Sequence, residues 1–283
     1  ELTKNEELVP KKLRFVGTDL ADILECPRRW FLARRVRADN KTSSAASLGA
    51  VVHLLAQHAL TSELSYEDIG DHLEAVWTQI PFEAAWLSAA EKATAEEALE
   101  RIFAWQQANE HRNLVGVEVD FSVDVKVADQ VITLAGSVDR LERDADGRLR
   151  IIDFKTSRTI PSKNEIADHE QLGLYQLAAT QGAFERIVPG ERRVADAELV
   201  FARGQDAHGS WPWPKVVKQQ SLDEVPHLSD ADKQYPTWVH HKLAQATKIA
   251  SSGEYRALRC ASCRFCAFQN GCPALASNKE VLT

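Results

Sequence analysis

Three charged side chains have the types and the spacing to bind a metal ion beside a phosphate: Asp139, Asp153 and Lys155. Two carboxylates supply the hard oxygen ligands of Mg²⁺ or Mn²⁺, and such an ion commonly binds a substrate phosphate as well. Lys155 follows Asp153 by two residues, so both side chains project from one face of a strand. The spacing therefore indicates a positively charged metal site for a phosphodiester, although the same charges would also fit an ordinary sheet edge.

A β-hairpin would bring the two aspartates together. A three-residue loop over 145–147 (ADG), with its glycine in a left-handed conformation, is a common hairpin closure. It pairs Glu142 with Arg150 and places Asp139 opposite Asp153. A two-residue turn would shift the register by one and put the aspartates on opposite faces. The pairing of opposite charges favours the three-residue loop.

Further side chains could complete this site. His53 lies off the apolar stripe of a helix expected over 45–60, although an isolated histidine on a helix is more often an ordinary surface or core residue. Gln171 and Tyr175 are four residues apart and share a helix face, which an ordinary amphipathic helix would also explain. Glu118, on the preceding expected strand, could add another carboxylate.

The cysteines form the second chemical signal. Four lie close together near the C-terminus, and the fifth, Cys26, is far away: Cys260, Cys263, Cys266 and Cys272. An odd number with CxxC spacing indicates a metal in a reducing compartment rather than a disulfide framework. Thiolates at this spacing bind zinc or an iron–sulfur cluster. Because the four C-terminal cysteines also have a ferredoxin-like spacing, the residues alone leave open which four bind.

Composition limits the class of protein. Of 283 residues, 44% are hydrophobic and 27% are charged, which is typical of a globular chain and excludes a mainly disordered one. No apolar run approaches the roughly 18 residues of a membrane span, and no secretory signal begins the sequence. We therefore expect a cytoplasmic protein without a membrane partner. The absence of methionine indicates a processed product or a piece of a longer polypeptide.

Charge is unevenly distributed along the chain. The net charge of −7 argues against a protein that coats nucleic acid. Between Pro10 and Lys41, however, nine basic residues stand against four acidic ones. An acidic total does not exclude nucleic-acid binding when one face concentrates positive charge.

The secondary structure that would position these residues is expected to be helical in the N-terminal part of the chain and mixed α/β after it. We expect a single α/β domain over 1–283, with a helical part over about 15–112, an α/β core over about 113–203, and a C-terminal helix and cysteine clasp over about 235–283. Helices are expected over 15–36, 45–60, 66–80, 82–112, 164–180 and 237–251, strands over 114–127, 131–155 and 195–202, and a loop over 204–226.

Four motifs follow one another along the chain: 49–53 (GAVVH), 136–140 (GSVDR), 151–156 (IIDFKT) and 171–175 (QLGLY). Together they resemble the PD-(D/E)XK nucleases of the RecB-like branch. The resemblance implies a restriction-endonuclease-like mixed sheet flanked by helices, with an N-terminal helical insertion. It also implies a Mg²⁺- or Mn²⁺-dependent deoxyribonuclease that acts on single-stranded DNA or on the ends of duplex DNA.

The same resemblance implies roles for individual residues. The metal ligands would be His53, Asp139 and Asp153. Lys155 would orient or polarise the attacking water, while Gln171 and Tyr175 would belong to an accessory motif that supports the site and the DNA.

The segment 25–31 (ECPRRWF) resembles the first half of the iron–sulfur staple in AddB-type and CRISPR-associated nucleases. That resemblance implies a structural [4Fe–4S] cluster held by Cys26, Cys263, Cys266 and Cys272. Cys260 departs from the pattern and would be left over.

The C-terminal cysteine pattern is similar to the end of actinobacterial AdnAB-type helicase–nuclease subunits. This implies an exonuclease module for DNA repair and recombination, working with a helicase motor domain or a partner subunit. No GxxxxGK[ST] loop occurs, so the motor would lie outside these residues. The alternatives are a standalone exonuclease, a non-catalytic iron–sulfur module that only guides DNA, and an iron–sulfur electron carrier.

Overall fold

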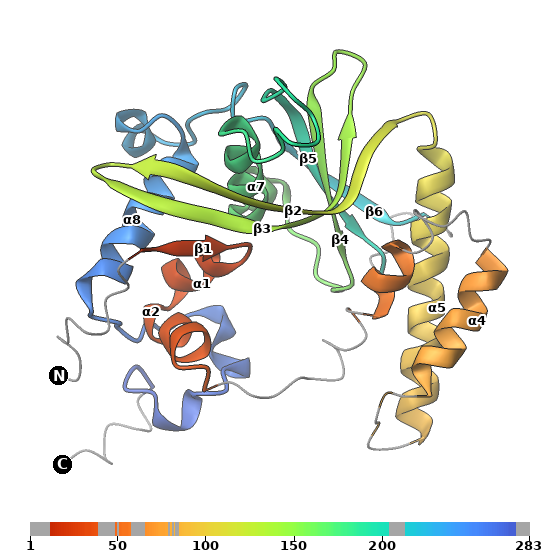
Figure 1. Ribbon diagram of the computed structural model, residues 1–283. Coiled ribbons are helices and arrows are strands. Elements are labelled where there is room, and N and C mark those ends of the chain that lie inside the picture. The colour runs from red at the N-terminus through yellow and green to blue at the C-terminus, as the bar shows by residue number, and fades with distance from the viewer. Residues whose placement is uncertain are drawn as a thin grey trace. The chain divides into compact units, whose positions relative to one another are not determined.

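The computed structural model describes residues 12–38, 49, 51–57, 66–78, 80, 82, 85–203 and 213–275. They contain a six-stranded mixed sheet with the strand order β1-β3-β4-β5-β6, in which β2 also pairs with β3 (Figure 1). The strands are β1 (Arg14–Val16), β2 (Asn113–Val127), β3 (Gln130–Arg143), β4 (Leu149–Lys155), β5 (Val194–Phe201) and β6 (Lys215–Gln220). The predicted mixed sheet flanked by helices is confirmed.

The chain divides into two compact units. The first comprises Glu1–Lys41, Phe121–Gly136 and Val225–Thr283, and the second comprises Thr42–Asp120 and Ser137–Glu224. The paired strands β2 and β3 contribute residues to both units. That residues 1–283 act as one domain stays a prediction.

The first unit is built from N-terminal and C-terminal segments of the described chain. Its helical elements are α1 (Asp19–Glu25), α2 (Pro27–Trp30), the π-helix η2 (Phe31–Arg35), the 3₁₀ helices η3 (Asp230–Gln234), η4 (Ala261–Phe265) and η5 (Gln269–Gly271), and α8 (Trp238–Ser252). Strand β1 runs parallel to β3, with Phe15 opposite Leu134. Helix α1 packs against α8, so the described N-terminal segment and the last long helix share one core.

The expected continuous helix over 15–36 is wrong in two places. Residues 14–16 form strand β1, and the helix breaks at Cys26, whose backbone is extended at φ −153° and ψ 98°. Pro27 follows, and the ring of a proline disfavours helical conformation in the residue before it. The break separates α1 from α2.

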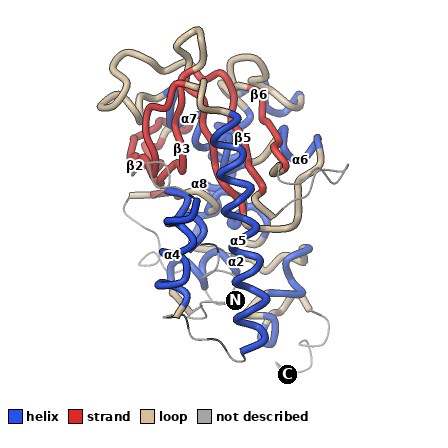
Figure 2. Tube along the Cα trace, turned by 90° about the vertical axis from the view of Figure 1, so that its right-hand side faces the viewer, coloured by secondary structure: helices blue, strands red, loops and turns tan. Residues whose placement is uncertain are grey.

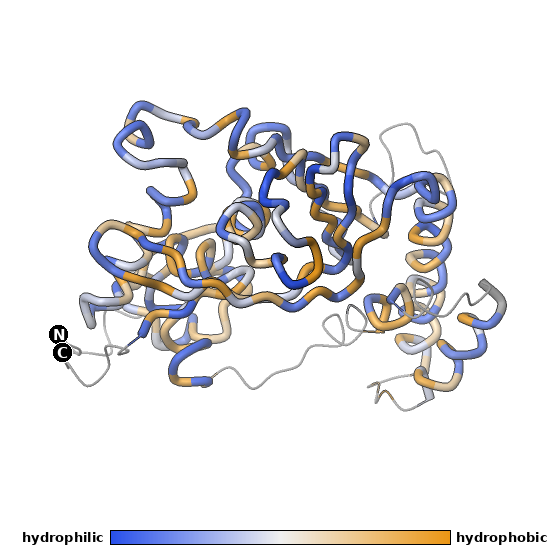
Figure 3. The backbone as a smooth tube through the Cα atoms, turned by 45° about the horizontal axis from the view of Figure 1, so that its top comes forward, coloured by the Kyte–Doolittle hydropathy of each residue, from blue (hydrophilic) through white to orange (hydrophobic). Residues whose placement is uncertain are grey.

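The second unit packs three helical segments against β4 and β5. These are residues 51–57, α4 (Tyr66–Trp77) and α5 (Ala85–Ala108), of which α4 and α5 lie side by side (Figure 2). Both hydrophobic and hydrophilic residues occur along α5 (Figure 3), and its buried side chains include Leu99, Ile102 and Trp105. The core contains Val52, Leu55, Ile69, Leu73, Leu99, Ile102, Trp105, Ile152, Phe154 and Val200.

Helices cover both faces of the sheet at β4. The ring of Phe154 meets Trp105 of α5 edge-on, with 5.6 Å between centroids. The neighbouring Asp153 accepts a hydrogen bond from Gln171 of α7 (Glu170–Thr180). Because successive strand residues point to opposite faces, α5 and α7 lie on opposite sides of β4.

The predicted hairpin register is confirmed between β3 and β4. Glu142 pairs with Arg150, Gly147 has a left-handed φ of 79°, and the Asp144 N–H donates to the Arg148 carbonyl at 2.9 Å. The three-residue loop therefore closes the hairpin as expected.

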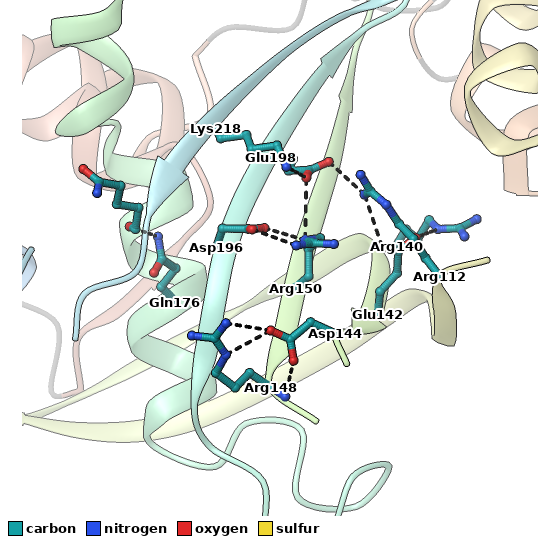
Figure 4. Close-up of polar contacts among 11 residues, drawn as sticks. Arg112, Arg140, Glu142, Asp144, Arg148, Arg150, Gln176, Asp196, Glu198 and Lys218 are labelled. Atoms are coloured by element: carbon teal, nitrogen blue, oxygen red, sulfur yellow. Dashed lines mark hydrogen bonds and ion pairs between the residues drawn. The ribbon is translucent and has the colours of Figure 1, made fainter. Parts of the chain in front are cut away.

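Ion pairs across the strands reinforce this register (Figure 4). Arg150 makes two hydrogen bonds to Asp196 of β5, at 2.7 and 2.9 Å. Glu142 and Glu198 are fully buried, and Arg112 lies 3.4 and 3.1 Å from them. Buried carboxylates require such partners, so a slipped register would leave several charges unpaired.

Two further expectations on secondary structure are corrected. The loop expected over 204–226 contains β6, which pairs antiparallel with β5. The helix expected over 164–180 is divided into α6 (Lys163–Ala167) and α7, because His169 has the extended backbone of a helix N-cap. Among the helices of the described part, none is both long enough and apolar enough to cross a membrane.

Candidate functional site

All six predicted catalytic residues lie in the second unit. Asp139 is on β3, Asp153 and Lys155 are on β4, Gln171 and Tyr175 are on α7, and His53 is in the helical residues 51–57. Hydrogen bonds and ion pairs join them into two adjoining groups.

The first group is built around Asp139. Its Oδ2 accepts a hydrogen bond from the Phe154 N–H at 2.6 Å and lies 3.4 Å from Nδ1 of His53. Burial lowers the pKa of His53, but the hydrogen bond to Asp139 and the negative charges of Asp139, Asp153 and Glu118 outweigh it, so the pKa is raised. The imidazole therefore lies in a strongly negative environment.

The second group is built around Asp153, which is only 3% exposed. Gln171 Nε2 donates to its Oδ1 at 3.0 Å, and Lys155 Nζ lies 2.7 Å from its Oδ2. That Oδ2 nevertheless accepts no hydrogen bond of normal geometry from the described residues. Burial and the charge of Asp139 raise the pKa of Asp153 to about 6, although Lys155 opposes the shift.

Helix α7 holds this second group in place. Gln171 Oε1 accepts a hydrogen bond from Lys155 Nζ at 2.7 Å, and Gln171 Nε2 also donates to the Tyr175 hydroxyl at 2.9 Å. Burial, followed by the charge of Asp153, raises the pKa of Tyr175, so its hydroxyl stays protonated. Of the predicted accessory motif, Gln171 therefore contacts Lys155 and Asp153 directly, and Tyr175 contacts Gln171.

Glu118 on β2 lies in the first group. The sequence indicated it only as a carboxylate that could be added to the metal site. His53, Glu118 and Asp139 each offer one ligand atom within 4.8 Å of the others. Asp153 is outside this closest set, and its oxygens contact Gln171 and Lys155. The sequence did carry a local signal for Glu118, since a glycine inside a strand, here Gly116, often marks a bulge.

The donor set fits a divalent cation. Burial, and then the negative charge of Asp139, raise the pKa of Glu118. Carboxylate oxygens suit Mn²⁺ or Mg²⁺, and a bound cation would offset the mutual repulsion of the carboxylates.

The cysteines lie in the first unit and line one pocket of about 290 Å³, measured with its open mouth. All five contribute: Cys26, Cys260, Cys263, Cys266 and Cys272. Cys26 is buried, and the other four are partly exposed. The structure therefore brings together the distant cysteine and the C-terminal run.

Polar contacts hold the two cysteine-bearing segments against each other. The Ser262 hydroxyl donates to Glu25 at 2.8 Å, Arg29 bonds the same carboxylate at 2.7 Å, and the Arg28 N–H donates to the Arg256 carbonyl at 3.1 Å. Burial, Cys263 and Glu25 raise the pKa of Cys260 to about 11.

The sulfur atoms are spread around the pocket. Cys260 and Cys263 Sγ are 3.7 Å apart, but no set of three cysteine sulfurs within 4.8 Å of one another occurs among the residues described. Four thiolates around one zinc ion, with bonds of about 2.3 Å, would lie about 3.8 Å apart. The Cys260–Cys263 pair has this spacing, but the described cysteines do not form a closed set of four around one point.

Comparison with known proteins gives a family match over most of the chain. A family profile described as the PD-(D/E)XK nuclease superfamily matches residues 17–273. Among solved structures, the crystal structure of SSO0001 is similar over 94% of this chain and 89% of that chain, with 16% sequence identity and a TM-score of 0.49. None of the curated proteins compared matches this chain.

Proposed function

Because the chain belongs to the PD-(D/E)XK nuclease superfamily, we propose that it is a divalent-metal-dependent deoxyribonuclease that hydrolyses phosphodiester bonds. The observation that carries this proposal is the convergence of four side chains in one unit, from two strands and one helix: His53, Asp139, Asp153 and Lys155. Ion pairs and a hydrogen bond join them. Such a combination of imidazole, carboxylates and ammonium is suited to a cation and a phosphate together.

In this proposal His53, Asp139 and Asp153 hold Mg²⁺ or Mn²⁺. A bound ion would lower the pKa of a coordinated water and stabilise negative charge on the scissile phosphate. Asp139 orients the His53 ring through Nδ1, and the Phe154 N–H fixes Asp139 in turn. These contacts hold the ligands in position before substrate arrives.

Lys155 supplies a positive charge for the attacking water or the phosphate. Asp153 and Gln171 both contact its ammonium group, which restricts a flexible side chain to one position. A preorganised charge of this kind stabilises a developing anion without reorganisation during the reaction. Tyr175 and Gln171 act as positioning residues for Lys155 and Asp153.

We further propose that the chain works exonucleolytically, in the cytoplasm, as the nuclease module of a DNA-repair helicase–nuclease. The support is the similarity of its motifs and cysteine pattern to AddB-type and AdnAB-type chains. The ATP-hydrolysing motor would then belong to another segment or to a partner subunit, since the sequence has no GxxxxGK[ST] loop. A standalone exonuclease is the alternative.

The cysteine pocket is proposed to hold a structural [4Fe–4S] cluster through Cys26, Cys263, Cys266 and Cys272. The support is the lining of one pocket by Cys26 together with the C-terminal cysteines, and the resemblance of the segment 25–31 to an iron–sulfur staple. When bound, the cluster would cross-link the start of the described chain to its C-terminal part, so that binding free energy contributes to folding. Zinc is the alternative occupant.

The nuclease proposal is tested on anaerobically purified protein with end-labelled single- and double-stranded DNA, with and without Mn²⁺. We expect degradation only with Mn²⁺, and a loss of at least about 100-fold in Asp153→Asn. Asp129→Asn, an exposed acid in the β2–β3 turn, is the control and should retain activity. A parent protein that binds DNA but leaves it intact would instead support a non-catalytic guiding module.

A further inference from the structure

The side chain of Phe265 is 80% exposed, although this residue belongs to the segment that carries the C-terminal cysteines. Phe265 is the last residue of η4 and lies between Cys263 and Cys266, which both line the cysteine pocket. Single exposed hydrophobic side chains are common on protein surfaces, so exposure alone does not indicate a binding site. The groups around the ring determine what it could bind.

A positive charge lies on one side of this ring. The guanidinium carbon of Arg264 is 4.8 Å from the centroid of the Phe265 ring, which is a cation–π contact. Arg264 is itself exposed, and none of the described carboxylates forms an ion pair with it. Its hydrogen-bond donors are therefore available to an anion, while most of the ring surface faces water.

The chain around this pair is basic. Between Gly253 and Leu275, three arginines stand against one acid, Glu254. The arginines are Arg256, Arg259 and Arg264, and all three are exposed. Arg256 lies 3.9 Å from Glu254, a long ion pair between partly exposed side chains that contributes little. The positive charge of this segment is therefore largely uncompensated by the acids of the described chain.

The N-terminal segment that contacts this part of the chain is basic as well. Residues 27–37 contain five arginines and no acid, and the Arg28 N–H donates to the Arg256 carbonyl at 3.1 Å. Two of the five pair with acids of α1. The other three form no ion pair within the described chain: Arg28, Arg35 and Arg37. Such a concentration of positive charge complements a polyanion.

We propose that Arg264 and Phe265 form a binding site for single-stranded DNA, in which the ring stacks on an unpaired base and the guanidinium binds a neighbouring phosphate. Every base has a face that can stack on an aromatic ring, and a basic surface follows the backbone. The inference rests on the proposed deoxyribonuclease function and adds a substrate contact in the first unit, whereas the proposed catalytic residues belong to the second.

Fluorescence anisotropy of labelled oligothymidine, in EDTA and without divalent metal, measures binding to anaerobically purified protein without cleavage. Phe265→Ala should raise the dissociation constant at least about fivefold, the low end of the loss for one stacked base. Phe265→Tyr keeps the ring and should bind like the parent. Trp86→Ala is the matched control, because it removes an aromatic side chain that is 73% exposed on α5, and it should also bind like the parent.

Salt dependence separates stacking from charge. Phe265→Ala should weaken binding without changing the slope of log K against log salt concentration, because a neutral ring releases no counterions. Arg264→Gln should reduce the magnitude of this slope by about 0.7, the value for one phosphate contact on a single strand. Arg186→Gln removes an exposed charge in the turn after α7 and should keep the slope of the parent. A DNA duplex should bind equally to Phe265→Ala and the parent.

Phe265→Ala should keep the iron content and the Tm of the parent, since its side chain is exposed. If iron is lost, Phe265→Leu and Phe265→Tyr decide the matter, because both fill the space and only tyrosine stacks. Equal affinities of these two variants, or a loss in Trp86→Ala as large as in Phe265→Ala, would overturn the inference. Parent-like binding by Phe265→Ala would also overturn it and would assign the exposed ring to a protein partner.

These outcomes are distinguishable from a failure of the proposed function, because binding is measured without catalysis. A parent that degrades DNA while Phe265→Ala binds oligothymidine normally refutes only the stacking site. A parent that degrades no DNA but binds single strands through Phe265 refutes the nuclease proposal, keeps this site and supports a guiding module.

Discussion

At the scale of single residues, one amide group connects the charges of the site. Gln171 accepts a hydrogen bond from Lys155 and donates hydrogen bonds to Asp153 and Tyr175. An amide has an acceptor and donors in fixed positions, so it can hold a cation and an anion at the same time. Neither an acid nor an alkyl side chain at this position could satisfy both.

Replacing Gln171 by Ala should therefore disturb geometry more than metal binding. We expect kcat to fall by about 10- to 100-fold, because Lys155 and Asp153 lose the group that orients them. Mn²⁺ affinity, measured by titration, should change much less. Gln181→Ala, at the exposed end of the same helix, is the control. A variant with parent kcat would refute the positioning role.

At the scale of elements, the β3–β4 hairpin determines which face carries the aspartates. Its loop depends on Gly147 at φ +79°, and its strands are held by buried ion pairs that a shift of one residue would break. The turn therefore controls whether Asp139 and Asp153 can serve one site.

Gly147→Ala should destabilise the protein by about 1 kcal/mol. The cost comes from the backbone conformation, because a Cβ at this position would make only an ordinary contact, 3.8 Å from Glu191 Oε2. Gly70→Ala should do the opposite. This residue is exposed inside helix α4 with free space around it, so alanine should stabilise by about 0.5–1 kcal/mol.

Both changes are measured as free energies of unfolding in urea. Equal shifts for the two variants would show that the left-handed conformation at Gly147 has no energetic consequence. Parent-like stability of Gly147→Ala would lead to the same conclusion.

At the scale of the whole molecule, contacts between segments that are far apart in the sequence build each unit. In the first unit the cysteine pocket joins the chain around Cys26 to the segment after α8. A metal cluster there would restrict the unfolded chain and add binding free energy to folding. Loss of one ligand should then affect stability well outside the pocket.

Cys26→Ser should lose iron and visible absorbance when purified without oxygen. A loss of about 2 kcal/mol would lower the Tm by roughly 4–8 °C in a chain of this size. Cys260→Ser should keep both the iron and the Tm. Loss of iron in Cys260→Ser but not in Cys26→Ser would show instead that the four C-terminal cysteines form the site.

Much of this molecule follows from local sequence. The ADG loop and the pairing of Glu142 with Arg150 predict the hairpin register, and that prediction is confirmed because both signals act between near neighbours. The break in the helix at Cys26 also has a local signal, because Pro27 disfavours helical conformation in the residue before it. The helical periodicity on both sides nevertheless led to the prediction of one continuous helix.

The rest was decided by contacts between residues far apart in the chain. Residue types indicated His53, Asp139 and Asp153, but only the packed fold places Glu118 in the closest set and turns Asp153 toward Lys155 and Gln171. Likewise, spacing identified a cysteine cluster, while tertiary structure placed Cys26 and Cys260 at the same pocket. Periodicity specifies which face a side chain occupies, whereas the distance between two such faces depends on the packing of the whole unit.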